Sequence, residues 1–203
     1  VDVVAGYVNF FLNKAEIANE VLSTYKVGAD FKSNIGKGKT VCFDFGSPNL
    51  AKYLHIGHLK SLIVGESLCR LFEEFGYTVK RLNFAGDYGT PFGKIIGGMQ
   101  KWGSLADVEA RGNDALQEYY VKFNQMEAED ENYSQLARDI FKKIEEKDSE
   151  IYPIYQKIVD IALKDSQRMF KLLGVEFDDN RGENYYNQFV PEVVKKLTDA
   201  GLL

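Results

Sequence analysis

Two short runs of β-branched and aromatic residues, 41–45 and 77–84, flank a single helical pattern and constrain the fold more than any other feature. The first run is continuous and apolar, which is typical of a strand buried in a parallel sheet. The second run alternates and is also rich in strand-forming residues. Between them, apolar residues recur at helical spacing from Leu59 to Phe75, and Gly76 supplies a helix stop. We therefore expect a βαβ unit of an α/β fold, with a parallel, doubly wound sheet and a ligand at the carboxyl ends of its strands.

The regions on either side of this unit differ from it in composition. Ahead of it lie a strand-like run, a stretch with helical spacing, and a linker rich in Gly, Lys, Asn and Ser: residues 7–12, 15–25 and 26–39. Residues 86–93 are expected to form a glycine-rich loop after the second strand. Glycine is scarce from about residue 114 to 173, which predicts two or three helices, and residues 191–200 predict a last helix.

The composition excludes several classes of protein. Hydrophobic side chains make up 45% of the 203 residues and the net charge is −5, which fits a folded globular chain and argues against a general nucleic-acid coat. No apolar stretch reaches the ~18 residues of a membrane-spanning helix, and no secretory leader is visible. Two cysteines, Cys42 and Cys69, are too few for a disulfide framework or a zinc site of the usual spacing. We therefore expect a cytoplasmic protein with no membrane association and no protein-bound zinc.

The two histidines of the chain, His55 and His58, lie three positions apart at the start of the predicted helix. A helix N-terminus offers free N–H groups and the positive end of the helix dipole, which favour an anion. The imidazoles add hydrogen-bond donors, and Gly57 leaves room for a flat group such as a purine. This set suits a nucleoside triphosphate attacked at its α-phosphate, because the imidazoles would stabilise the charge that grows there. The alternative is a histidine pair that only caps the helix.

Four segments carry a resemblance to a known family. They read DFGSPNLAK, HIGHLKS, GDYGTPFG and GENYY, at residues 44–52, 55–61, 86–93 and 182–186. The sequence resembles the class I aminoacyl-tRNA synthetases, whose first signature is HIGH. Within that class it resembles the arginyl-tRNA synthetases, which combine SSPN-x-AK, HxGHLRS, GDWGTQFG and GES-x-Y in this order. Residues 7–12 are similar to the last strand of that family's N-terminal tRNA-contacting domain.

Four positions depart from the family pattern. Gly46 stands for the usual Ser, Lys60 for Arg, Tyr88 for the common Trp and Pro91 for Gln. Tyr88 keeps an aromatic surface, and Lys60 keeps the charge without the bidentate geometry of Arg. Pro91 lacks both an amide side chain and a backbone N–H, so we assign it no binding role.

The resemblance implies a fold and its division into domains. The fold is the first half of a Rossmann-like class I synthetase catalytic domain, an α/β domain with a parallel sheet, together with a helical insertion and the tail of an N-terminal α+β domain. The N-terminal tail and its linker are expected at residues 1–37, and the first half of the catalytic domain at 38–112. The helical insertion is expected at 113–175, and the continuation of the catalytic domain at 176–203.

The resemblance also assigns roles to individual residues. Arginine is expected to bind a carboxylate that pairs with its guanidinium group and polar groups that hold its backbone: Asp44, Ser47, Asn49 and His58. ATP is expected to bind at Lys52, His55, Gly57 and His58. The catalytic groups among these are the side chains of Lys52, His55 and His58. Asp87, in the glycine-rich loop, is expected to support the site structurally.

Members of the family activate L-arginine with ATP and Mg²⁺ and transfer it to tRNA(Arg). The resemblance thus implies an arginine–tRNA ligase whose partners are tRNA(Arg), L-arginine and ATP and whose parent protein is a monomer. The second signature of the class, a lysine-rich KMSKS-type loop, does not occur in these 203 residues, so we expect a piece of a longer enzyme that is inactive by itself. Two alternatives stay open. One is a glutaminyl or glutamyl synthetase, suggested by residues 53–58 with Lys60 and Ser61; the other is a non-catalytic module that binds nucleotide or tRNA.

Overall fold

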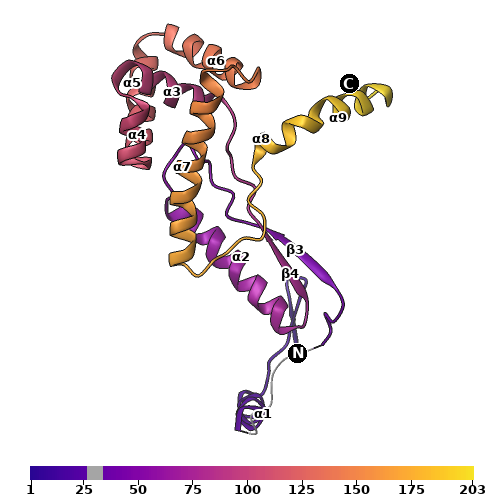
Figure 1. The fold of residues 1–203 in the computed structure, drawn as a ribbon. Coiled ribbons are helices and arrows are strands. Elements are labelled where there is room, and N and C mark those ends of the chain that lie inside the picture. The colour runs from indigo at the N-terminus through magenta and orange to yellow at the C-terminus, as the bar shows by residue number, and fades with distance from the viewer. Residues whose placement is uncertain (27–33) are drawn as a thin grey trace.

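The computed structural model describes residues 1–26 and 34–203 (Figure 1). The N-terminal segment forms an antiparallel hairpin and a helix: β1 (Asp2–Val4), β2 (Tyr7–Asn9) and α1 (Lys14–Lys26). The helix predicted at 15–25 is confirmed. The strand predicted at 7–12 is confirmed only as far as Asn9, because β1 pairs with just three of its residues. Residues 27–33 of the predicted linker lie outside the described residues.

The predicted βαβ unit is confirmed. It consists of two strands joined by a helix: β3 (Thr40–Asp44), α2 (Ile56–Glu74) and β4 (Thr78–Leu82). The strands are parallel, in a register that pairs Thr40 with Thr78 and Asp44 with Leu82. Helix α2 packs on both strands and buries Leu62 and Cys69 against them. Gly76, which ends the helix, has a φ of 82°, the left-handed conformation that glycine adopts without strain.

A third segment extends the sheet beside β4. Leu82 and Asp179 form a parallel bridge, and the Asn83 N–H donates to the Asp179 carbonyl oxygen at 2.8 Å. The Arg81 N–H donates to the Asp178 carboxylate, also at 2.8 Å. Residues 178–179 therefore continue the parallel order of the sheet, although they lie almost 100 positions after β4 in the chain.

A helical body occupies one end of the molecule in Figure 1. It is formed by five helices: α3 (Thr90–Trp102), α4 (Leu105–Arg111), α5 (Asn113–Glu129), α6 (Asn132–Glu145) and α7 (Ile151–Leu172). The last three confirm the helices predicted between residues 114 and 173. The chain then continues through α8 (Glu183–Tyr186), a short 3₁₀ turn and α9 (Val190–Asp199), which confirms the last predicted helix.

The expected glycine-rich loop at 86–93 is wrong in its second half, because α3 begins at Thr90. The glycines of α3 serve close packing instead. A Cβ at Gly93 would lie 2.1 Å from the Ala137 carbonyl oxygen of α6, and one at Gly98 would lie 2.8 Å from the Tyr119 carbonyl oxygen of α5. These contacts require that the backbones approach directly, which glycine permits at a cost in helix propensity.

Two hydrophobic clusters hold these parts together. The larger one fills the helical body and also takes in Leu50, Ala51 and Ala85 from the loops that follow β3 and β4. The smaller one lies between α2 and the sheet and includes Phe45, Leu62 and Val79. The loop after β3 therefore contributes residues to both clusters. Among the described residues, no helix is both long and apolar enough to cross a membrane.

Candidate functional site

The loop after β3 begins with a strained turn that presents two of the predicted site residues. Asp44 ends the strand, and the next residues turn sharply, with φ values of 86° at Gly46 and 42° at Ser47. A left-handed conformation costs a non-glycine residue about 1–2 kcal/mol, so neighbouring contacts must hold Ser47 in place. The Ser47 hydroxyl donates to the Asp44 carboxylate at 3.1 Å, and its N–H donates to the Asn83 side-chain oxygen at 3.1 Å. The structure thus brings Asp44 and Ser47 into direct contact.

The second half of this loop runs beside the segment that leaves β4. Asn49 forms a parallel bridge with Gly86, whose N–H donates to the Pro48 carbonyl oxygen at 2.9 Å. The Asn49 side-chain oxygen accepts from the Ala51 N–H at 3.0 Å and closes a local turn. This contact fixes the Asn49 amide at the exposed face of the loop.

The two histidines start helix α2 by capping each other's backbone. His55 is the N-cap residue, and its Nδ1 accepts from the Gly57 N–H at 3.1 Å. The Nδ1 of His58 accepts in turn from the His55 N–H at 3.1 Å, which completes a capping box. The ring centres lie 4.1 Å apart. Burial lowers the pKa of His58, and the neighbouring His55 lowers it further.

Gly57 leaves space that the His55 ring uses. A Cβ at this position would lie 2.9 Å from Cε1 of His55, so a side chain here would displace the imidazole. The bare backbone at the helix start and the exposed His55 ring therefore form one surface, which the half-buried His58 ring adjoins. The structure thus brings His55, Gly57 and His58 together at the start of α2.

Lys52 makes its contact with the helical body. Its ammonium group lies 5.7 Å from the ring centre of Tyr120 in α5. Its backbone N–H donates to the Asn49 carbonyl oxygen. The next residue reaches the same side, since the Tyr53 hydroxyl donates to the Asp114 carboxylate. These two contacts tie the loop before the histidines to α5.

Asp87 joins the loop after β4 to two helices. Its carboxylate accepts from the Asn184 N–H at 2.8 Å in the first turn of α8, and its carbonyl oxygen accepts from the Tyr155 hydroxyl of α7 at 2.6 Å. A Cβ at Gly182 would lie 2.5 Å from the Asp87 Cγ, so the two segments pack tightly. Burial raises the pKa of Asp87, although backbone N–H donors oppose this effect. All of these contacts are made with other groups of the chain.

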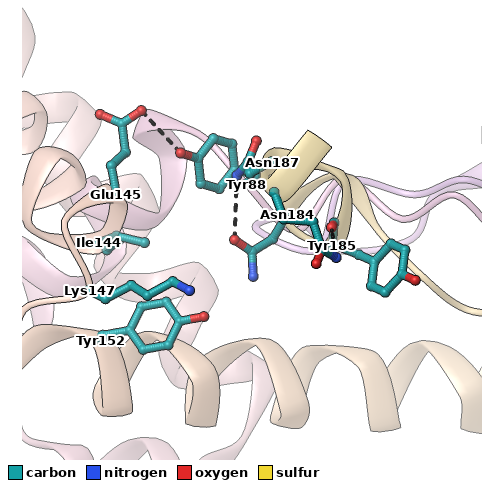
Figure 2. Close-up of a pocket in the computed structure, with 9 residues that line it drawn as sticks. Tyr88, Ile144, Glu145, Lys147, Tyr152, Asn184, Tyr185 and Asn187 are labelled. Carbon is teal, nitrogen blue, oxygen red and sulfur yellow. Dashed lines mark hydrogen bonds between the residues drawn. The ribbon is translucent and has the colours of Figure 1, made fainter. Parts of the chain in front are cut away.

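A pocket of about 380 Å³ lies beside this junction, between the loop after β4, the start of α7 and α8 (Figure 2). The Tyr88 hydroxyl donates to Glu145 at 3.0 Å across its upper edge, and Tyr152 closes the opposite side. Burial and the Glu145 contact raise the pKa of Tyr88 to about 12. The motif segments at 86–93 and 182–186 thus meet in space, which their separation in the sequence does not reveal.

Sequence reasoning missed two groups of polar residues around the sheet. Asn83, at the end of β4, is 1% exposed and hydrogen-bonds both Ser47 and Asn180. Arg81 donates to both Glu66 and Glu73 of α2 and so clamps the helix to the strand. A signal for each was present, because Arg81 and Asn83 follow Val79 at a spacing of two and therefore share one face of the predicted strand with an apolar residue. Among the residues that the structure describes, no cluster of three or more His, Cys, Asp or Glu side chains could hold a metal ion.

The comparisons with known proteins decide the family. Residues 19–203 match the family model described as tRNA synthetases class I (R), catalytic domain. The chain belongs to this family. It is 40% identical over 199 residues to a protein named arginine–tRNA ligase from Clostridium botulinum, a match that covers 97% of this chain and 35% of that protein. It is also 40% identical over 202 residues to one so named from Streptococcus equi, covering 98% and 36%. The chain therefore spans about a third of the length of these relatives.

Solved structures of class I (R) synthetases share the fold. The arginyl-tRNA synthetase of Plasmodium falciparum matches with a TM-score of 0.63 and 26% identity, over 84% of this chain and 28% of that one. That of Thermus thermophilus matches with a TM-score of 0.60 at 22% identity, over 86% and 28%, and supports the fold alone. The α/β fold with a parallel sheet and helices is therefore that of a class I synthetase catalytic fragment.

Proposed function

We propose that this chain supplies the ATP-binding half and part of the arginine-binding half of the active site of an arginine–tRNA ligase. The observation that carries the proposal is the reciprocal capping of His55 and His58 at the start of α2, beside the turn that holds Asp44 and Ser47. In the proposed reaction, the carboxylate of L-arginine attacks the α-phosphate of ATP and pyrophosphate leaves. A terminal ribose hydroxyl of tRNA(Arg) then attacks the carbonyl carbon of arginyl-adenylate and AMP leaves.

Each of the site residues has a proposed role. The two imidazoles donate to phosphate oxygens, whose negative charge grows in the transition state, and the positive end of the helix dipole favours the same charge. Gly57 lets the adenine approach the backbone. Asp44 accepts from the guanidinium group, while Ser47 and Asn49 hold the amino and carboxylate groups of arginine. We propose that Lys52 leaves Tyr120 to reach the phosphates, since a cation–π contact at an exposed site is worth about 0.5–1 kcal/mol.

Magnesium is proposed to accompany ATP. Mg²⁺ in phosphate-transfer sites is usually held by the substrate phosphates with one or two carboxylates.

The proposed location is the cytoplasm. The two cysteines, Cys42 and Cys69, are free thiols, which is in keeping with a reducing compartment.

The proposal is tested by ATP–pyrophosphate exchange with the full-length gene product, in the presence of tRNA(Arg). We expect exchange that depends on arginine and not on glutamine or glutamate. His58→Glu keeps an acceptor for the His55 N–H but removes the donor, and should lower kcat by about 10²–10³-fold. His58→Gln keeps the acceptor and adds an N–H donor, and should lose far less.

The control is Lys142→Ala, on the exposed face of α6, which should leave the exchange unchanged. A preference for glutamine or glutamate would support the other synthetase type. ATP binding without any exchange would support a non-catalytic module. Equal activity of His58→Glu and the wild type would show that the imidazole does not act on the phosphate.

A further inference from the structure

The Asn83 side chain links the turn that holds Ser47 to the segment that flanks the sheet. It lies at the carboxyl end of β4 and is 1% exposed. Its oxygen accepts from the Ser47 N–H at 3.1 Å, and its NH₂ group donates to the Asn180 side-chain oxygen at 3.0 Å. The backbone is fixed as well, since the Asn83 N–H donates to the Asp179 carbonyl oxygen at 2.8 Å. Both ends of the amide are thus paired, as a buried polar group requires.

Only a carboxamide serves both contacts in this orientation. The Ser47 N–H needs an acceptor, and the Asn180 oxygen needs a donor about one amide width away. Ser47 has a φ of 42°, a conformation that serine does not hold without support. The hydrogen bond from Asn83 is that support, and the neighbouring Gly46 is held in the same way by the Ser61 hydroxyl at 3.2 Å.

The consequence concerns the side chain of Ser47. In this conformation its hydroxyl donates to Asp44 at 3.1 Å, so the two groups face the same exposed surface. If the turn relaxed, the hydroxyl would leave Asp44 and both groups would change direction. The histidine surface would keep its shape, because His55 and His58 are fixed by their own capping contacts.

We infer that Asn83 is a positioning residue for the amino-acid substrate: it holds Ser47, and through it Asp44, in the geometry that binds arginine. The inference rests on the proposed function. It predicts different effects on the two substrates. Loss of Asn83 should disturb the residues proposed to bind arginine and leave those proposed to bind ATP in place.

The test measures ATP–pyrophosphate exchange by the full-length gene product, with the KM for arginine and the KM for ATP determined separately. Asn83→Ala should raise the KM for arginine about tenfold or more and change the KM for ATP less than about twofold. Asn83→Asp keeps an acceptor for the Ser47 N–H, and the Asn180 amide can turn to donate to it. This variant should restore a KM for arginine within about threefold of the wild type.

Two further variants keep the test decisive. Lys80→Ala, on the exposed face of the same strand, is the matched control and should change neither KM. Asn180→Leu removes the acceptor for the Asn83 NH₂ group and should raise the KM for arginine a few-fold, which tests the inference even if Asn83→Ala does not fold.

The outcomes are distinguishable. A wild type that shows no arginine-dependent exchange refutes the proposed function, and this inference with it. If the wild type is active but the Asn83 and Asn180 variants lose only kcat and thermal stability, with the KM for arginine unchanged, Asn83 is merely structural and the inference fails. An equal rise of both KM values also refutes it.

Discussion

The helical body and the sheet unit are stabilised in different ways. Among the described residues, the cluster in the helical body contains 17 buried hydrophobic side chains, and the cluster between α2 and the sheet contains six. Both parts contain ion pairs, such as Lys94–Glu127 in the helical body, and in the sheet unit Arg81 pairs with Glu66 and Glu73. The candidate site lies on the sheet side, where the residues that face the ligand must stay exposed. This difference indicates that the helical body is the more stable part. The sheet unit, which carries the candidate site, buries fewer hydrophobic side chains.

The sharpest test of this comparison is Phe92→Ala in α3. Phe92 is fully buried and packs edge-on against Tyr155, with ring centres 5.4 Å apart. Truncation should cost about 3–5 kcal/mol, because a cavity remains where the ring was. Hydrogen exchange should therefore accelerate at least about 100-fold in α3, α5 and α6, and much less in β3 and β4. Equal acceleration in both regions would show that they open as one unit and would break the comparison.

The second test removes charge from the sheet unit. The Glu66 and Arg81 side chains are 11% and 14% exposed. Burial opposes the charge on Glu66, but hydrogen bonds from Arg81 and Arg70 outweigh it and hold the pKa of Glu66 below its ordinary value of 4.5. Glu66→Gln should destabilise α2 and β4 by about 2 kcal/mol at neutral pH, because Arg81 loses a charged acceptor.

The pH dependence of this effect has a definite sign. A carboxylate with a lowered pKa stabilises the fold above its unfolded pKa, and this contribution is lost as the pH falls through the folded value. The wild type and Glu66→Gln should therefore differ most in their free energy of unfolding above pH 4.5, and this difference should shrink in more acidic solution. Hydrogen exchange of α2 at several pH values measures it. Glu74→Gln, on the exposed side of the same helix, is the control, and a difference that does not depend on pH would contradict the prediction.

The smallest expected effect on stability comes from Gly57→Ala. The new Cβ would meet the His55 ring at 2.9 Å and displace it from its capping position. The lost cap costs about 1 kcal/mol, and the better helix propensity of Ala returns a similar amount, so the stability of α2 should change little. The KM for ATP should rise about tenfold, because the ring and the new methyl group both intrude on the nucleotide surface. Ser67→Ala, further along α2, should change neither quantity.

The sequence predicted the sheet unit better than it predicted the contacts between segments. Strand, helix and strand followed from local patterns at 41–45, 59–75 and 77–84, and the histidine pair followed from its place at the helix start. Helix α3 was missed because its glycines suggested a loop. Their function depends on Ala137 and Tyr119, which lie in other helices and whose approach no local pattern encodes.

The site shows the same limit. A motif identified Asp44 and Ser47 as candidates, but their mutual contact at 3.1 Å came only from the structure. The partners of Asn83 could not be predicted, because Ser47 and Asn180 are 36 and 97 positions away. Lys52 shows the opposite case, since its motif suggests phosphate but its contact here is with Tyr120.

The capping box at the start of α2 also decides where the imidazole protons reside. Each histidine uses Nδ1 as an acceptor for a backbone N–H, so the proton of the neutral ring must sit on Nε2. The helix start thus selects one tautomer of the neutral ring for both histidines, and in that tautomer each Nε2–H is a hydrogen-bond donor. The lowered pKa of His58 preserves this state. Protonation of Nδ1 would remove an acceptor and weaken the helix start, so one proton would alter the first turn of α2 and the surface for phosphate together.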